Sequence, residues 1–245
     1  QISDNLLLNI LPNAVAEELR TKNSVEPRYY EDATIVFTDF AGFTLSTANI
    51  SAEELVMTLH AYFTGFDNII DQYGLEKLKT IGDSYLYVGG LPSRSSSHPV
   101  DAILAAWQII QFGMHRAKSG DSIHWPVRIG VHTGPVIAGV VGIHKFAFDI
   151  WGESVNFASR MESSGAPNQI NISDRTYVRV KDFFACEPRG RLRTKDGQEV
   201  EMYFVKSLAP PLMVDQAAFA RRYRAYFRKD PPEVPAGLLT SGGIA

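Results

Sequence analysis

Two aspartates early in the chain are the residues most able to hold a metal ion. Asp39 lies near the end of a predicted buried strand over residues 33–40, and Asp83 lies at the tip of a predicted two-residue hairpin, Gly82-Asp83. A carboxylate in a buried strand is costly unless a cation meets it. If the hairpin lies beside that strand, both carboxylates reach one edge of the sheet and could hold two Mg²⁺ or Mn²⁺ ions. For either aspartate alone, a role in its turn or as a cap remains the alternative.

The segment directly after Asp39 has the character of a phosphate-binding turn. Gly42 lets the backbone turn, and successive backbone N–H groups near a helix start can bind phosphate oxygens. This pattern is weak by itself. The candidate segment is Phe40, Ala41, Gly42, Phe43 and Thr44.

A second polar pair lies on a predicted helix over residues 152–163. Asn156 and Arg160 are four residues apart and therefore share one face of that helix. The planar, permanently charged guanidinium of Arg160 suits phosphate oxygens, and Asn156 could orient a sugar or a water. Taken alone, the pair equally fits a solvated surface helix.

The elements that must position these residues alternate between strands and helices. The apolar spacing predicts a first helix over residues 4–20, broken near Leu11 by Pro12. Tight turns at Gly82-Asp83 and Gly134-Pro135 predict antiparallel pairs, and hence an α+β sandwich of helices on a mixed sheet. The remaining predicted helices cover 51–73 and 100–117, and the strands 75–81, 84–88, 127–133, 136–141, 170–172, 192–194 and 200–205.

The bulk composition excludes several classes of protein. A net charge of -3 over 245 residues argues against a general nucleic-acid binder, which would be basic. The single cysteine, Cys186, rules out an intrachain disulfide and favours a cytoplasmic setting. No apolar run is long enough to span a bilayer, and no signal peptide is visible. Because the sequence begins at Gln1, an upstream sensor or membrane region is an open expectation.

Five segments resemble one known family, the class III adenylyl and guanylyl cyclases, in the same chain order. The resemblance runs from about Leu7 to about Leu208, nearly the whole chain. The resemblance implies a ferredoxin-like, palm-type mixed sheet and three parts: an N-terminal helical segment (1–25), a catalytic domain (26–208) and a C-terminal extension (209–245). The segments are FTDFAGFT (Phe37–Thr44), KTIGDSYL (Lys79–Leu86), VRIGVHTGPVIAGVVG (Val127–Gly142), FDIWGESVNFASRM (Phe148–Met161) and RTKDGQEVEMYFV (Arg193–Val205).

The resemblance also implies a reaction and a role for each candidate residue. Asp39 and Asp83 would bind two Mg²⁺ or Mn²⁺ ions while the ribose 3′-oxygen of ATP attacks the α-phosphorus and pyrophosphate leaves. Arg160 would stabilise the transition state and Asn156 would orient the ribose. Such catalysis is mainly positioning and charge neutralisation. The terminal phosphates would be held by Lys195 and Arg128.

The purine would be read by Lys79 and Asp149. A lysine only donates hydrogen bonds and a carboxylate only accepts them, which complements N1 and N6 of adenine but opposes guanine. Guanylyl members carry a glutamate and a small residue such as cysteine at these places, so ATP is the expected substrate. Alternation alone cannot choose between Lys77 and Lys79, because both would face the same side of an ideal strand.

In this family the active sites form between two catalytic domains, and this chain carries both sets of residues. A homodimer with two equivalent sites is therefore expected. The alternatives are a guanylyl cyclase, an inactive nucleotide-binding regulatory module and, remotely, a nucleic-acid polymerase.

Two weaker features stay open. The repeat of Phe219, Tyr223 and Phe227 among arginines predicts a helix that packs on its own domain or meets a membrane or partner, followed by a flexible tail from Pro231. His132, inside a strand, fits a structural role.

Overall fold

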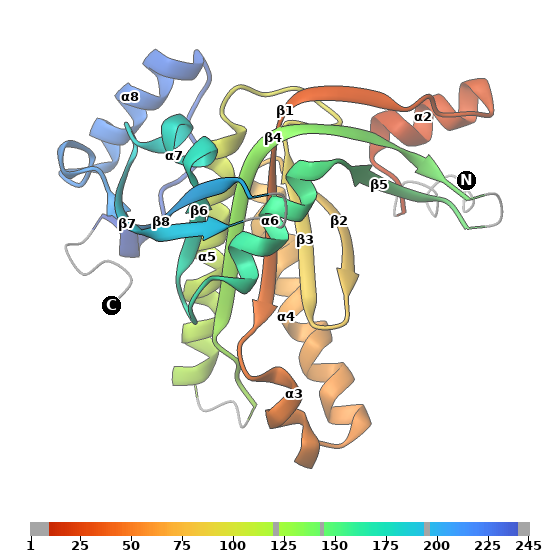
Figure 1. Ribbon diagram of the computed structural model, residues 1–245, viewed down its shortest axis with the longest axis horizontal. Helices are drawn as coiled ribbons and strands as arrows, with labels where there is room; N and C mark the ends of the chain where they lie inside the picture. Colours follow the sequence, from red (N-terminus) through yellow and green to blue (C-terminus); the bar gives the residue numbers. More distant parts are fainter. Residues whose placement is uncertain (1–9, 120–122, 143–144, 194–196, 240–245) are drawn as a thin grey trace.

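One mixed sheet of eight strands organises the residues that the structure describes, 10–119, 123–142, 145–193 and 197–239, in a computed structural model (Figure 1). The strand order is β2-β3-β1-β4-β6-β8-β7, and β5 pairs with β4. All described pairs are antiparallel except β4 with β6. The strands are β1 (Arg28–Phe40), β2 (Glu76–Ile81), β3 (Ser84–Gly89), β4 (Val127–Val141), β5 (Ala147–Trp151), β6 (Ile170–Ser173), β7 (Phe184–Arg193) and β8 (Glu199–Leu208).

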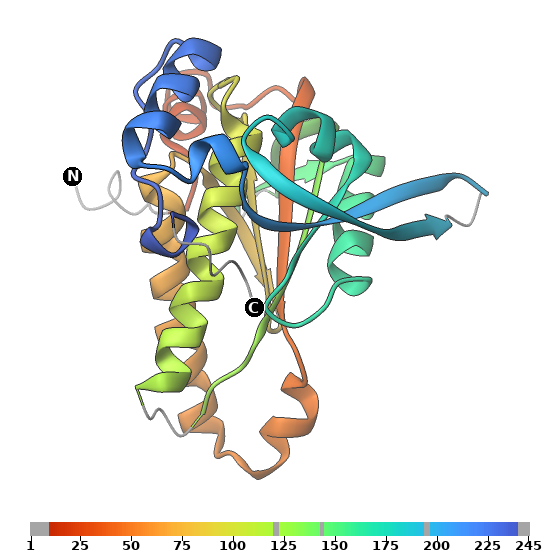
Figure 2. The same cartoon turned by 90° about the vertical axis from the view of Figure 1, so that its left-hand side faces the viewer.

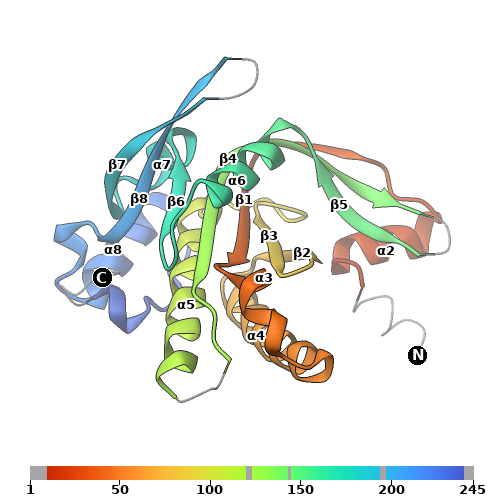
Figure 3. The same cartoon turned by 60° about the horizontal axis from the view of Figure 1, so that its bottom comes forward.

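Helices cover both faces of the sheet, which confirms the predicted α+β class. Figure 2 shows α4 and α5 side by side on one face, and Figure 3 shows α6 on the other. This explains the unbroken apolar run in β1, because a strand buried on both faces needs no alternation. The helices are α2 (Asn13–Lys22), α3 (Phe43–Ser46), α4 (Ala52–Gln72), α5 (His98–Lys118), α6 (Glu153–Ser163), α7 (Asp174–Val180) and α8 (Gln216–Phe227), with 3-10 turns at Thr47–Asn49, Pro210–Leu212 and Ala236–Leu238.

Two apolar cores lie on the two faces. The α4/α5 side is built on large aromatic residues such as Tyr62, Phe66 and Trp107, each no more than 1% exposed. The opposite side joins Val15 of α2 and Ala158 of α6 to the other face of the sheet. The edge of the sheet that carries the candidate residues is therefore held from both sides.

The predicted break at Gly134-Pro135 is wrong, because β4 runs through it as one strand of 15 residues. Proline lacks the N–H that an interior strand position needs. The register of β1 against β4 shifts between Tyr30 and Ala33, which leaves extra β1 residues opposite Pro135. This β-bulge in the partner strand removes the need for the missing hydrogen bond.

Several elements were missed or drawn too short. No sequence pattern predicted β5 or the seven-residue helix α7. The first turn of α7 is capped by the Ser173 hydroxyl, which accepts from the backbone N–H of Thr176. The closing hairpin is also longer than predicted, since β7 begins at Phe184 and β8 continues to Leu208. Figure 2 shows this hairpin projecting away from the body of the domain.

Both ends of the described chain pack on the domain. Helix α2 begins directly after Pro12, as the predicted break required, and residues 4–9 of the predicted helix lie outside the described residues. Phe219 and Tyr223 of α8 are fully buried, which supports packing on the chain's own domain. The prediction of a flexible tail from Pro231 is wrong over residues 231–239, because Val234 and Leu238 are buried in the α4/α5 core. Within the described ranges, no helix has the length and apolarity needed to cross a membrane.

Candidate active site

Asp39 and Asp83 meet at one edge of the sheet, as predicted. Asp39 is the penultimate residue of β1, and Asp83 lies in the turn between β2 and β3, next to the point where β3 pairs with β1. The Ser84 hydroxyl donates to Oδ1 of Asp39 at 2.9 Å. Burial and then the negative charge of Asp39 raise the pKa of Asp83 above its ordinary value. Two half-buried carboxylates with excess negative charge are a donor set that suits a hard divalent cation.

The predicted phosphate turn lies beside the two carboxylates. Residues 40–45 line one cavity of about 200 Å³ together with Asp39, Asp83 and Arg128. The backbone N–H of Phe40 donates to Asp83, and that of Ala41 donates to the carbonyl of Pro126 at 2.9 Å. Gly42, with φ of 76°, occupies the left-handed region that glycine tolerates. The cavity is therefore lined by both carboxylates and by the predicted phosphate turn.

Phe40 contributes to this cavity through its backbone. Its side chain is 2% exposed and lies in a cluster of aromatic rings. The ring centroid of Tyr62 is 4.8 Å away and that of Trp125 is 5.2 Å away. The buried ring anchors the turn against α4.

Arg128 lies with the aspartates and is held by a residue that the sequence analysis missed. Its Nη2 donates to Oδ2 of Asp39 at 3.0 Å, and its Nε donates to Oε1 of Glu162. Glu162 is 8% exposed, and burial raises the pKa of its carboxyl against the opposing effect of Arg128. Its spacing of four from the buried Ala158 could have indicated a charge on the inner face of α6.

Lys79 and Asp149, the predicted purine pair, are in direct contact. Nζ of Lys79 donates to Oδ2 of Asp149, which joins β2 to β5 across 70 residues of sequence. Lys77 turns the other way and pairs with Asp67 of α4 at 2.8 Å. A bulge causes the difference, because Lys77 lies opposite Tyr87 whereas Lys79 lies opposite Leu86. The expectation that both lysines share one face therefore fails in this strand.

Asn156 and Arg160 lie on the outer side of α6, away from the cavity of the two aspartates. Neither side chain forms a hydrogen bond or ion pair within the described part of the chain, and neither lines that cavity. Lys79 and Asp149 do not line it either. One chain thus presents two separate groups of candidate residues. Lys195 lies outside the described residues.

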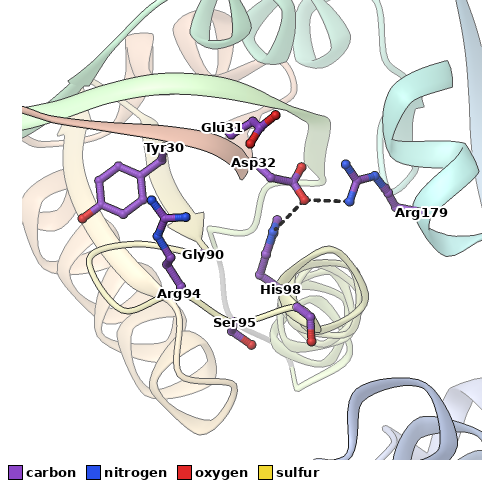
Figure 4. Close-up of a pocket in the computed structure, with 9 residues that line it drawn as sticks. Tyr30, Glu31, Asp32, Gly90, Arg94, Ser95, His98 and Arg179 are labelled. Carbon is purple, nitrogen blue, oxygen red and sulfur yellow. Dashed lines mark hydrogen bonds and ion pairs between the residues drawn. The ribbon is translucent and has the colours of Figure 1, made fainter.

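A larger cavity elsewhere in the described structure contains none of these residues (Figure 4). It has a volume of about 420 Å³ and lies toward the opposite end of β1. Its wall holds Asp32, whose carboxylate pairs with Arg179 at 2.6 Å and lies 3.6 Å from Nε2 of His98. His98, and then Arg179, lower the pKa of Asp32.

Comparisons with known proteins identify the family of the chain. The sequence model of the family "Adenylate and Guanylate cyclase catalytic domain" matches residues 25–207. An adenylate cyclase of Mycobacterium tuberculosis is 37% identical over 195 residues, which are 79% of this chain and 44% of that protein. Retinal guanylyl cyclase 1 of Rattus norvegicus is 39% identical over 206 residues, 82% of this chain and 18% of that protein. The chain thus spans less than half the length of these relatives.

Solved structures show the same likeness. The adenylyl cyclase CyaB from P. aeruginosa superposes with a TM-score of 0.68 at 28% identity, covering 74% of this chain and 95% of that one. The catalytic core of a rhodopsin-guanylyl cyclase with converted specificity, in complex with ATPalphaS, gives a TM-score of 0.69 at 34% identity, covering 74% and 97%. The chain belongs to the adenylate and guanylate cyclase catalytic domain family, the class III nucleotidyl cyclases.

Proposed function

We propose that the chain is an adenylyl cyclase that converts ATP into 3′,5′-cyclic AMP and pyrophosphate. The contact between Lys79 and Asp149 carries this proposal, because it places one donor and one acceptor side by side at the sheet surface. Adenine presents an acceptor at N1 and a donor at N6. Guanine presents the reverse and would set donor against donor and oxygen against carboxylate.

Asp39 and Asp83 would hold two Mg²⁺ or Mn²⁺ ions. When bound, the metal ions would supply activation of the ribose 3′-oxygen and neutralise charge on the phosphates. The residues present fit this role, since burial and then the negative charge of Asp39 raise the pKa of Asp83, and a divalent cation would offset both effects. The backbone of residues 40–44 and the side chains of Arg128 and Lys195 would bind the phosphates.

Asn156 and Arg160 would act on a nucleotide held by the aspartates of a second copy. Asn156 is exposed and Arg160 is half-buried, and neither side chain has a hydrogen-bond or ion-pair partner within the described residues. Asn156 would orient the ribose, and Arg160 would stabilise charge at the α-phosphorus in the transition state. A homodimer with twofold symmetry would then contain two complete sites.

Guanylyl cyclase activity is the competing function, because the guanylyl relatives are as similar in sequence as the adenylate cyclase. Purified chain should be assayed with ATP and GTP in parallel, in Mg²⁺ and in Mn²⁺, with Asp39→Ala as the blank. We expect cyclic AMP well above the blank and little cyclic GMP. Mostly cyclic GMP would reject the adenine assignment. Absence of both products at high protein concentration, with ATP analogues still bound, would favour an inactive regulatory module.

Asp83→Asn is expected to raise the melting temperature of the metal-free protein while it abolishes activity. Because the folded-state pKa of Asp83 is raised, its protonated form favours folding, and that contribution is lost as pH rises through the folded pKa. Asparagine imitates the neutral form at pH 7. Differential scanning fluorimetry should also show that Mn²⁺ stabilises the wild type but not the variant. A variant that is less stable than wild type without metal would contradict the charge argument.

A further inference from the structure

Helix α6, which carries Asn156 and Arg160, rests directly on three alternate residues of β4. A Cβ on Gly130 would lie 1.9 Å from the backbone N of Glu162, and one on Gly134 would lie 2.6 Å from Oγ of Ser154. The helix backbone therefore lies against the strand at Gly130, near the end of α6, and the Ser154 side chain lies against it at Gly134, near the start of α6. Residues two apart in a strand face the same side. His132 lies between the two glycines, on the side of β4 that faces α6.

The ring of His132 contacts Phe157 of α6. The ring centroids are 5.0 Å apart at an interplanar angle of 30°. Phe157 follows Asn156 directly and precedes Arg160 by three residues. On its other side Phe157 packs with Leu192 against Met161, Val200 and Met202, so it is held between His132 and the β7–β8 hairpin.

His132 is itself fixed by a buried polar chain. Its Nδ1 lies 2.8 Å from Oγ of Ser173, and Ser173 lies 3.3 Å from Oγ1 of Thr176. Oγ1 of Thr176 lies 3.1 Å from Oγ1 of Thr133, which faces the other side of the sheet. The polar chain therefore passes from one face of the sheet to the other beyond the end of β6. Ser173 and Thr176 have no exposed surface. A residue tethered in this way has little freedom to turn its ring.

The second ring nitrogen of His132 has no hydrogen-bond partner in the described structure. The ring is 2% exposed, and burial lowers the pKa of His132 to about 4. It is therefore neutral near pH 7. The charged groups of the packed elements include Arg175 of α7, which also lowers the pKa of His132, and Glu162 and Arg160 of α6.

We propose that His132 is a positioning residue, which holds Phe157 and thereby fixes the placement of Asn156 and Arg160 for the reaction. The consequence for the rate rests on the proposed function, whereas the consequence for α6 itself does not. A merely structural histidine would lower stability without a selective effect on α6. Displacement of reacting groups by about 1 Å can cost about 10²-fold in rate.

His132→Asn tests this proposal, because asparagine keeps a polar atom near the position of Nδ1 but removes the ring. His98→Asn is the matched control. His98 is 3% exposed, and its Nδ1 lies 2.8 Å from Oγ1 of Thr34, which in turn lies 2.9 Å from Oγ1 of Thr133 in the same polar chain. We expect His132→Asn to lower kcat by about 10-fold to 10²-fold, with KM for ATP changed less than about twofold. His98→Asn should lose comparable thermal stability and keep its kcat. Equal kcat in the two variants, at equal folded fraction, would overturn the proposal.

Hydrogen exchange gives a readout that does not depend on cyclase activity. The α6 amides should exchange at least about tenfold faster in His132→Asn than in His98→Asn, since local opening would be easier. Unchanged α6 exchange would overturn the proposal even if the wild type makes no cyclic nucleotide.

Phe157→Leu covers the case in which His132→Asn does not fold, because Phe157 is only partly buried. It should lower kcat and speed α6 exchange in the same way. The double variant His132→Asn/Phe157→Leu should have a kcat no lower than that of the poorer single variant, because His132 is proposed to act through Phe157. Fully additive losses in kcat would overturn the proposal.

Discussion

Arg160→Ala is expected to lower kcat by about 10²–10³-fold and to leave KM for ATP within about threefold of wild type. The guanidinium of Arg160 is proposed to meet charge that develops only in the transition state, so its loss affects the rate more than binding. Because the Arg160 side chain forms no ion pair or hydrogen bond within the described residues, its removal breaks no such interaction of the folded chain. Steady-state kinetics with ATP and Mn²⁺ provides the measurement.

Arg160→Lys is the matched variant, since it keeps the charge but loses the planar fork. It should recover only part of the rate. An exposed arginine on α8, such as Arg221, provides the control for surface charge, and Arg221→Ala should keep full kcat. A KM effect in Arg160→Ala with unchanged kcat would show that this residue only binds substrate.

Replacing Lys79 by Glu together with Asp149 by Cys is expected to reverse the preference between ATP and GTP. Glutamate would accept from N1 and N2 of guanine, and the thiol would no longer oppose O6. Each mismatched buried hydrogen-bonding group costs about 1–3 kcal/mol, and 1.4 kcal/mol is tenfold. The ratio of kcat/KM for ATP over GTP should therefore fall by at least about 10²-fold, measured with both nucleotides in one protein preparation.

Lys77→Ala is the control for this experiment, because the bulge in β2 turns Lys77 toward Asp67. It should leave the ATP to GTP ratio unchanged, whereas Lys79→Ala should reduce it. A larger effect of Lys77→Ala than of Lys79→Ala would reject the assignment of the purine-reading lysine.

The sequence was enough to predict the meeting of Asp39 with Asp83, because it depends on local signals. A hydrophobic strand that ends in a carboxylate and a two-residue hairpin both follow from neighbouring residues. The face of the sheet toward which Lys79 points depends instead on a bulge in β2, and no residue pattern in β2 predicts that bulge. Similarly, β4 passes through Pro135 only because the bulge in β1 lies opposite it. Both features depend on how two strands pair and could not be predicted from one segment alone.

Glu162 and the described tail illustrate a second limit. The salt bridge of Glu162 with Arg128 spans 34 residues of sequence, and each residue by itself looks like an ordinary surface charge. Val234 and Leu238 lie in a stretch rich in proline and glycine, which suggested a flexible tail. They are buried because the α4/α5 core offers them an apolar surface that becomes visible only once the helices are assembled.

Mixing two inactive variants tests most directly whether two copies of this chain build each site. Asp39→Ala removes a metal ligand and leaves Arg160 intact, and Arg160→Ala does the reverse. If equal amounts of the two variants exchange subunits at random, about half of the dimers contain one copy of each. Each mixed dimer has one complete site and one that lacks both residues, so about one quarter of wild-type activity should return. Tagged subunits and co-purification would verify that mixed dimers form. Cyclic AMP formation at that level would support the account, and mixed dimers no more active than their parents would contradict it.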